Sequence, residues 1–314
     1  MSILVYVAVA ILLLVLISGA YVFFAACLRG KELPWLDKAA LEKTSYGRFY
    51  EHISAADQWL HRHDAQDLWI KSTDGLKLHG LWIPAQQQRG TIILAHGYRS
   101  CYLADFGLVL DLYHNLGLNL LIPDQRCHGK SEGRYITFGV KESGDILQWI
   151  DYHNKALGAF PTVLSGLSMG ASTVMYLADK ALPVNVCGII ADCGFTSPKE
   201  IISLVYKRTV HLWPVPSMLA AELFARLLAG FSLSAKDTRT TLSGSKLPIL
   251  MVHGKADKFV PCKMSEEAYA LCRSPKQLIL AEDAGHGVSF LHIPEQYTAA
   301  VINFLKTNLD GFSG

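Results

Sequence analysis

The sequence of 314 residues carries little charge and has no basic run. Its 29 Lys and Arg side chains nearly balance 27 Asp and Glu, giving a formal net charge of +2. Nucleic-acid binding normally requires a basic patch or stripe, so nucleic acid is excluded as an expected partner. The sequence also has no internal repeat and no low-complexity linker. Its length therefore predicts one large core or two small ones.

The sequence has seven cysteines, which are too few for a disulfide-rich protein of this length. The number is odd, and Cys187 and Cys193 lie in or beside an apolar run of the kind that holds buried free thiols. A chain this large does not need a disulfide scaffold. Free thiols agree with a reducing compartment.

No Lys or Arg precedes the long hydrophobic run at residues 3–28. A cleaved signal peptide would have a basic start and a shorter apolar core. The run is long enough to cross a bilayer, which takes about 20 residues. Residues 1–30 are therefore expected to form an uncleaved transmembrane anchor. A signal peptide remains an alternative, as does lipoprotein processing at Phe24-Ala25-Ala26-Cys27.

Basic residues follow the apolar run directly. Arg29 and Lys31 come first, and Lys38, Lys43 and Arg48 lie close behind. The positive-inside rule then predicts a single-pass protein of the cell membrane with its body in the cytoplasm. An extracellular body or a lipoprotein is the alternative.

After a helical connector at residues 31–64, strands and helices alternate through residues 65–314. Apolar runs predict strands at 67–71, 77–83, 91–95, 118–122, 162–165, 186–191, 247–252 and 277–281. Ser72-Thr73-Asp74-Gly75 predicts a hairpin turn between the first two. Helices are expected at 102–115, 141–157, 171–181, 263–272 and 294–309. The order predicts an α/β fold with a mostly parallel, doubly wound sheet of eight strands.

Residues 194–246 interrupt this alternation after the sixth strand. They hold helix-like stretches at about 198–210 and 217–228, and so much chain predicts a small helical lid. Leu219, Leu223 and Leu227 recur at a spacing that predicts one helix face packed on the sheet domain.

One pentapeptide joins an apolar strand to a helix-like stretch through a sharp turn. Gly166-Leu167-Ser168-Met169-Gly170 follows the apolar run 160–164 and precedes residues 171–180. In this context Gly-x-Ser-x-Gly is typical of a nucleophile elbow, with the serine at the apex of a strained turn. The glycines leave room where chain segments crowd together. Ser168 is therefore the candidate nucleophile.

The other groups that acyl transfer requires also follow strands. His96-Gly97-Tyr98 comes after the third strand, so the backbone amides of Tyr98 and Met169 are the candidate oxyanion donors. Asp257 follows the seventh strand and His286 the eighth. The carboxyl ends of parallel strands share one edge, so both side chains are expected to converge on Ser168. His286 would take the serine proton, and Asp257 would hold the imidazole tautomer.

Together these motifs resemble the α/β-hydrolase family over about residues 65–310. The matching patterns are His96-Gly97, the loop 123–133, the elbow 166–170, the segment 253–261 and Gly285-His286. Within the family the chain is similar to bacterial membrane-anchored hydrolases of the serine-aminopeptidase-like, Bem46-like group. Some relatives place the triad acid after the sixth strand, where this chain has Asp192. The pattern around Asp257 is the stronger match.

The resemblance implies esterase, lipase, thioesterase, amidase or peptidase chemistry. We expect a serine hydrolase that cleaves carboxylic esters through a covalent acyl-enzyme, without a metal ion or organic cofactor. An amidase or peptidase, or an acyltransferase, would use the same residues. A non-catalytic binding protein usually lacks a triad residue, and none is missing here. The sequence does not predict the oligomeric state.

The expected substrate is a small ester or amide with an apolar acyl group. Trp213 lies between the two helix-like stretches of the lid. Pro214 and Pro216, which follow it closely, stiffen the backbone. We therefore expect Trp213 to line the acyl pocket.

Overall fold

An eight-stranded sheet, in the order β1-β2-β4-β3-β5-β6-β7-β8, forms the centre of the molecule. The computed structural model describes residues 3–211 and 214–309. The strands are β1 (Gln66–Lys71), β2 (Lys77–Ile83), β3 (Gly90–Ala95), β4 (Leu118–Pro123), β5 (Thr162–Leu167), β6 (Val186–Asp192), β7 (Ile249–Gly254) and β8 (Lys276–Ala281). β2 pairs antiparallel with β1 and β4, and the other pairs are parallel. The predicted α/β-hydrolase fold is confirmed.

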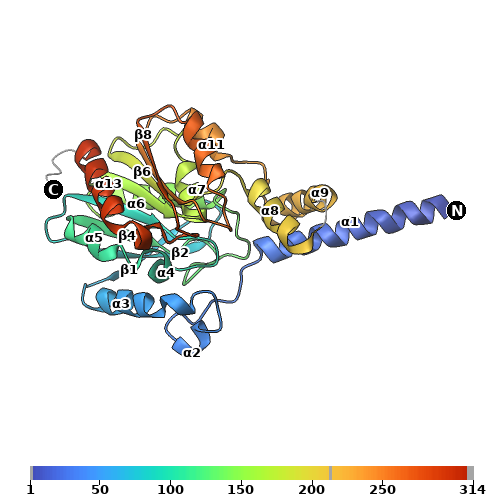
Figure 1. Cartoon of the computed structure of the whole chain (residues 1–314), viewed down its shortest axis with the longest axis horizontal. Helices are drawn as coiled ribbons and strands as arrows, with labels where there is room; N and C mark the ends of the chain where they lie inside the picture. Colours follow the sequence, from blue (N-terminus) through green and yellow to red (C-terminus); the bar gives the residue numbers. More distant parts are fainter. Residues whose placement is uncertain (1–2, 212–213, 310–314) are drawn as a thin grey trace.

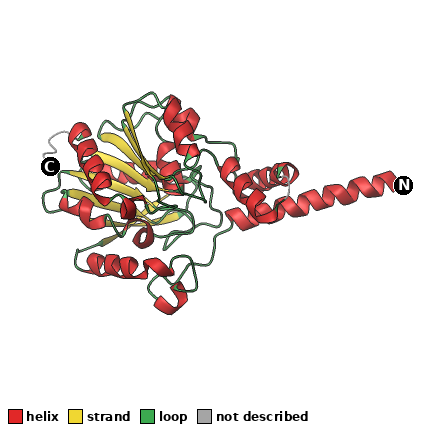
Figure 2. Ribbon diagram, viewed as in Figure 1, coloured by secondary structure: helices red, strands yellow, loops and turns green. Residues whose placement is uncertain are grey.

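Helices cover both faces of this sheet (Figures 1 and 2). In β3, Ile92 and Leu94 face one core, whereas Ile93 and Ala95 face the other. The first core is closed by α3 (Tyr50–His61), α5 (Leu110–Asn115) and α13 (Pro294–Asn308). The second is closed by α6 (Glu142–Ala156), α7 (Met169–Met175) and α11 (Lys263–Leu271). Burial on both faces explains why the central strands are continuously apolar.

The expected helix at 102–115 is instead two short helices, α4 (Tyr102–Phe106) and α5. The chain turns at Gly107, where α3 approaches closely. A Cβ at Gly107 would lie 2.8 Å from the Cβ of Ala56 and 2.4 Å from the carbonyl oxygen of Leu103. α3 itself belongs to the connector, which also holds α2 (Lys38–Leu41) and the 3₁₀ turn η1 (Gly47–Phe49).

A helical segment lies between β6 and β7. It comprises α8 (Pro198–Val210), α9 (Val215–Phe224), the π-helical turn η2 (Ala225–Ala229) and α10 (Thr238–Ser243). The start of α8 is fixed by Pro198 and by the Ser197 hydroxyl, which accepts a hydrogen bond from the N–H of Glu200. The last helix, α10, was not expected from the sequence.

The expected packing of α9 on the sheet domain is wrong. Leu219, Leu223 and Leu227 are 67%, 45% and 71% exposed. The buried side of α9, including Met218 and Ala221, packs instead in a cluster with the end of the N-terminal helix α1 (Ile3–Cys27). Figure 1 shows α9 lying alongside that helix. Helical spacing identified an apolar face of α9, but it did not identify the neighbour.

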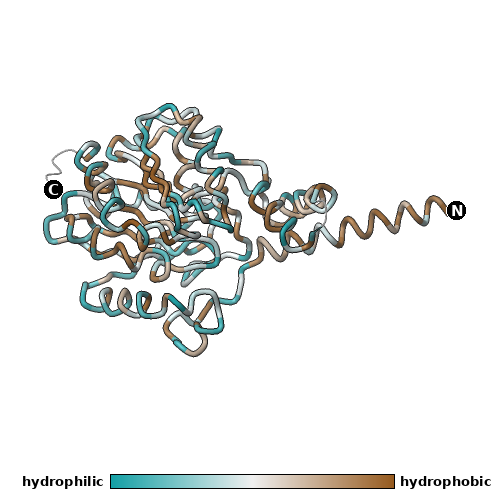
Figure 3. Tube along the Cα trace, in the orientation of Figure 1, coloured by the Kyte–Doolittle hydropathy of each residue, from teal (hydrophilic) through white to brown (hydrophobic). Residues whose placement is uncertain are grey.

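α1 projects from the body as a single helix of 25 residues and is apolar along nearly its whole length (Figure 3). Its length and composition make it a candidate membrane span. The end nearer the body meets α9 through small side chains. A Cβ at Gly19 would lie 2.2 Å from the Cβ of Ala220, and the hydroxyls of Ser18 and Ser217 are 2.9 Å apart. Small residues allow such close helix contact, as is common between membrane helices.

The turn between β5 and α7 brings three backbone segments into contact. A Cβ at Gly166 would lie 2.2 Å from the carbonyl carbon of Gly170. A Cβ at Gly170 would lie 1.7 Å from the carbonyl oxygen of Ala95 in β3. Backbone atoms cannot move aside as a flexible side chain can, so both positions require glycine.

Gly170→Ala should therefore lower the free energy of unfolding by about 3 kcal/mol or more, because overpacking here displaces a central strand. Gly144→Ala is the matched control, since a Cβ there has no atom within 4 Å and the site is helical. That variant should be neutral or more stable by up to about 1 kcal/mol. Thermal and urea unfolding of the full chain in detergent measure both. Equal effects of the two variants would contradict the proposed crowding.

Candidate active site

Three predicted side chains meet at the carboxyl edge of the sheet. Ser168 lies between β5 and α7, Asp257 follows β7, and His286 follows β8. Nε2 of His286 is 2.9 Å from the Ser168 hydroxyl oxygen, and its Nδ1 is 2.6 Å from a carboxylate oxygen of Asp257. With the ring proton on Nδ1 donated to Asp257, Nε2 can accept the serine proton.

The backbone of Ser168 is strained. Its φ is +56° and its ψ is −114°, a region that residues with a side chain rarely adopt. The N–H of Ser168 donates to the carbonyl oxygen of Asp192 at 2.8 Å, which ties the turn to β6. The hydroxyl is thereby held above the sheet edge, facing His286.

Asp257 is held in its charged form. Burial alone would raise the pKa of Asp257, but hydrogen bonds with His253 and His286 outweigh burial and hold that pKa well below its usual range. One carboxylate oxygen also accepts the N–H groups of Phe259 and Val260, at 2.8 and 2.9 Å. A carboxylate so placed can stabilise a positively charged His286.

Asp192, the alternative acid, is in a different state. Its carboxylate is buried, and burial raises the pKa of Asp192 to about 6. It accepts the hydroxyl of Ser289 at 3.3 Å, whereas Nδ1 of His286 pairs with Asp257. The geometry therefore favours Asp257 as the partner of His286.

The loop after β3 lies directly against the serine. A Cβ at Gly97 would be 3.4 Å from the Cβ of Ser168, so the chain entering Tyr98 runs beside the nucleophile. Met169 is the first residue of α7, where an N–H has no acceptor within its own helix. The amides of Tyr98 and Met169 thus come from the two segments that flank the serine. Their role as oxyanion donors stays a prediction.

Asp105 and the buried His128 hold this loop. The sequence analysis assigned this role to neither residue, although His128 lies within the matching loop 123–133. Asp105 accepts the N–H of Gly97 at 2.5 Å and the hydroxyl of Ser100 at 2.6 Å. Nε2 of His128 accepts the N–H of Arg99 at 2.9 Å. No sequence pattern separates Asp105 from an ordinary first-turn aspartate of a helix, so its position became apparent only from the fold.

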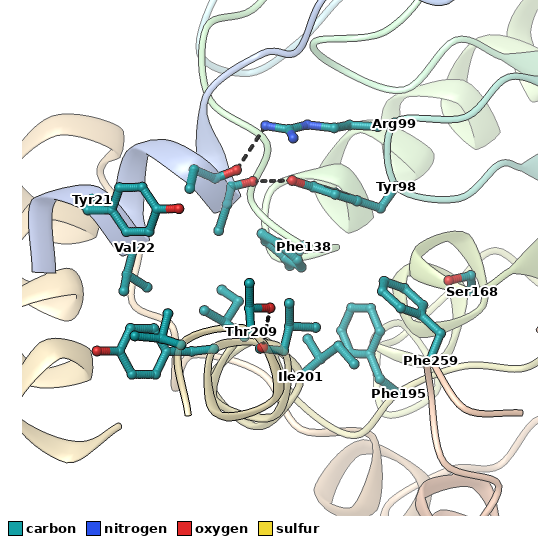
Figure 4. A pocket seen from close by; sticks show the side chains of 16 residues that line it. Tyr21, Val22, Tyr98, Arg99, Phe138, Ser168, Phe195, Ile201, Thr209 and Phe259 are labelled. Atoms are coloured by element: carbon teal, nitrogen blue, oxygen red, sulfur yellow. Dashed lines mark hydrogen bonds between the residues drawn. The ribbon is translucent and has the colours of Figure 1, made fainter. Parts of the chain in front are cut away.

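The same loop is bonded to the end of α1 (Figure 4). The Tyr98 hydroxyl donates to the carbonyl oxygen of Ala26 at 2.8 Å. The Arg99 guanidinium donates to the carbonyl oxygens of Ala25 and Leu28, both at 3.0 Å. These carbonyls lie at the helix end, where a cation is favourable.

An apolar cavity of about 280 Å³ runs from Ser168 to Tyr21 and Val22 of α1 (Figure 4). Its wall is formed by α1, the loop after β3, α8 and three loop phenylalanines. The lining residues are Tyr21, Val22, Ala25, Ala26, Tyr98, Arg99, Phe138, Ser168, Phe195, Ile201, Ile202, Val205, Tyr206, Thr209, Val210 and Phe259. The contribution of α1 was not predicted, although Gly19, Ala25 and Ala26 are small residues of the kind that permit helix packing. The predicted pocket residue Trp213 lies outside the described residues.

A second cavity, of about 400 Å³, meets the first at Ser168. His286, Asp192 and Asp105 line it, together with Arg48 and Phe49 of the connector. Ser168 is therefore accessible from an apolar side and from a more polar side.

Cys193, Asp257 and His286 place possible metal-ligand atoms within 4.8 Å of one another. Their chemistry does not fit a metal site. Burial raises the pKa of the Cys193 thiol well above its usual value, whereas a ligating cysteine must lose its proton. The 2.6 Å separation of His286 and Asp257 is that of a hydrogen-bonded pair.

The chain is similar to several curated proteins. It is 30% identical to the uncharacterized protein YfhR of Salmonella typhi, over 78% of this chain and 83% of that protein. It is 28% identical to the uncharacterized protein YqkD of Bacillus subtilis, over 77% and 79%. An uncharacterized membrane protein of Saccharomyces cerevisiae is 23% identical over 68% and 70%.

Among solved structures, the Pyrococcus furiosus esterase Pf2001 has the same fold, with a TM-score of 0.64 and 24% identity over 79% of this chain and 94% of that one. An esterase from Exiguobacterium antarcticum superposes with a TM-score of 0.58 at 20% identity, covering 77% and 100%. A family model described as "Alpha/beta hydrolase family" matches residues 92–302. This match, together with the fold and the long alignment to YfhR, shows that the chain belongs to the alpha/beta hydrolase family.

Proposed function

We propose that this protein is a serine hydrolase that cleaves carboxylic esters with apolar acyl groups. One observation carries the proposal. His286 lies 2.9 Å from the Ser168 hydroxyl and 2.6 Å from Asp257, at the inner end of an apolar cavity. This is the arrangement in which a weak alcohol becomes a nucleophile at neutral pH.

In the first half of the reaction, the Ser168 hydroxyl oxygen attacks the ester carbonyl carbon while Nε2 of His286 takes the hydroxyl proton. The former carbonyl oxygen, now negatively charged, accepts hydrogen bonds from the N–H groups of Tyr98 and Met169. The bond to the leaving oxygen then breaks, and that oxygen takes the proton from His286. An alcohol leaves, and the acyl group remains on Ser168. Asp257 stabilises the charged imidazole throughout.

In the second half, water replaces the alcohol. His286 takes a proton from the water as its oxygen attacks the acyl carbon, and returns the proton to the Ser168 oxygen as that bond breaks. A carboxylic acid leaves and the free serine is restored. No step calls on a metal ion or an organic cofactor.

The two cavities support an ester as the substrate. The apolar cavity would hold the acyl group, and the cavity lined by Arg48 and Asp105 would hold the leaving alcohol. An amide would react through the same residues. A panel of p-nitrophenyl esters and aminoacyl amides distinguishes the two, and faster turnover of the amides would replace the ester assignment with an amidase or peptidase.

Ser168→Ala should abolish labelling by a fluorophosphonate probe and lower kcat for p-nitrophenyl esters by at least about 10⁴-fold, because the acyl-enzyme cannot form. Ser172→Ala is the matched control. It lies in α7, the helix that Ser168 precedes, and its hydroxyl donates to the carbonyl oxygen of Phe195. The control should still be labelled. Labelling of Ser168→Ala at the wild-type rate would show that another residue is the nucleophile.

Asp257→Asn should lower kcat by about 10⁴-fold, because an amide favours the wrong tautomer of His286. Asp192→Asn should leave kcat within a few-fold of wild type. The opposite pattern would move the acid to the end of β6. Both variants are read from the same ester assay.

Asp192→Asn should also change the pH dependence of stability. The folded-state pKa of Asp192 is about 6, above its ordinary value of 3.8. Between these values the folded chain holds a proton that the unfolded chain releases, so wild-type stability falls as pH rises from about 4 to 6. The variant has no carboxyl group at this position, so its stability does not fall in this way. Above pH 6 its free energy of unfolding should gain on the order of 2–3 kcal/mol relative to wild type. Melting temperatures at pH 4 and pH 7 report the difference.

We further propose that α1 is an uncleaved membrane span with the body in the cytoplasm. Its apolar length and the basic residues Arg29 and Lys31 support this topology. Lipoprotein processing would expose Cys27 to lipid attachment, yet Cys27 is 1% exposed, and its carbonyl accepts the N–H of Ile136 at 2.6 Å. Protease added to spheroplasts should leave the body intact, and protease added after lysis should digest it. Digestion before lysis would place the body outside.

A further inference from the structure

The outer surface of α9 is apolar, although nothing in the described part of the chain covers it. Its large exposed side chains, with those of the following turn η2, are Val215, Leu219, Leu223, Leu227 and Leu228. Over residues 215–229 the charged side chains are Glu222 and Arg226. They pair with each other at 2.5 Å. A surface helix in water would present charged and polar groups on its outer side instead.

This surface adjoins α1. Beyond the contacts of Ser18 with Ser217 and Gly19 with Ala220, the rings of Phe23 and Phe224 stack with centroids 6.4 Å apart. The exposed leucines of α9 thus extend the apolar surface of α1. The medium that surrounds this end of α1 therefore also contacts the outer surface of α9.

The length of α1 fixes the depth of this contact. A bilayer core of about 30 Å takes about 20 helical residues, at about 1.5 Å per residue. Only residues 3–14 are exposed throughout, and such a stretch covers only about 18 Å. To cross the core, the span must continue to about Val22, past the residues that bind α9. α9 then lies at the depth of the hydrocarbon edge.

The cavity from Ser168 ends at the same depth. Its far end is bounded by Tyr21 and Val22 of α1 (Figure 4), and Tyr206 and Val210 of α8 also line the cavity. Tyr21 is 63% exposed, and tyrosine is enriched at the boundary between hydrocarbon and head groups. An acyl chain could therefore pass from the bilayer to Ser168 along apolar side chains, without crossing water.

We propose that α9 is immersed in the bilayer beside α1, and that the cavity takes acyl chains directly from the membrane. The substrates are then membrane-resident lipids that carry a long-chain ester. This inference rests on the proposed ester hydrolysis at Ser168. Beyond ester hydrolysis, it assigns α9 and α1 to substrate delivery, with Leu219, Leu223 and Leu227 as the lipid-facing residues.

The test compares two substrates on the full chain in phosphatidylcholine vesicles. One is a fluorogenic oleoyl ester dissolved in the bilayer, and the other is water-soluble p-nitrophenyl acetate. The double variant Leu219→Glu and Leu227→Glu should lower turnover of the oleoyl ester at least tenfold and change acetate turnover less than twofold. Its matched control is Val184→Glu with Leu271→Glu, because both residues are exposed and lie away from α9. The control should change neither rate.

Wild-type turnover of the oleoyl ester by the α9 variant would overturn the proposal. Failure of wild-type protein to hydrolyse either ester would instead overturn ester hydrolysis itself, so the two failures are distinct. Immersion is tested separately with a tryptophan probe. Brominated-acyl phosphatidylcholine should quench added fluorescence in Leu223→Trp but not in Val184→Trp. Equal quenching in both variants would exclude immersion of α9.

Discussion

The crossing of β5, α7 and β3 at two glycines determines where Ser168, the candidate nucleophile, lies. Gly166 and Gly170 allow backbone segments to approach at distances that a side chain would prevent. The chain can then leave β5, turn sharply and enter α7 beside β3. The strain at Ser168, with its positive φ, is maintained because the crossing and the bond to β6 leave the turn no alternative. The loop after β3, which holds the predicted oxyanion donor Tyr98, and His286 could act only if Ser168 is held in this position.

The pKa values of two buried carboxyl groups at the same sheet edge are shifted in opposite directions. Asp257 accepts backbone N–H groups and pairs with histidine, so its pKa is held down despite burial. Asp192 lacks comparable partners among the described residues, and burial raises its pKa to about 6. The fold thus provides one charged acid and one acid that is easily neutralised. Such divergence between neighbouring carboxyl groups favours Asp257 over Asp192 as the partner of His286.

The residues of the candidate site were predictable because each follows a strand. A parallel sheet brings the ends of its strands to one edge, so chain order alone placed Ser168, Asp257 and His286 together. Asp105 and His128 could not be found in this way, because their hydrogen bonds to the loop after β3 depend on how the chain folds back on itself and have no sequence pattern. The helix predicted over 102–115 failed at Gly107, where the approach of α3 is a tertiary contact. The leucines of α9 showed the same limit, since periodicity reveals an apolar face but not what covers it.

The hydrogen bonds from Tyr98 and Arg99 to the end of α1 make this helix part of the candidate active site. A chain trimmed at residue 30 to obtain a soluble enzyme would lose Tyr21, Val22, Ala25 and Ala26 from the cavity wall. Tyr98 and Arg99 would lose the carbonyl groups that they bind, and the loop beside Ser168 would lose its outer support. Kinetics of such a fragment would describe an altered enzyme. For this protein, solubility and an intact active site are competing experimental goals.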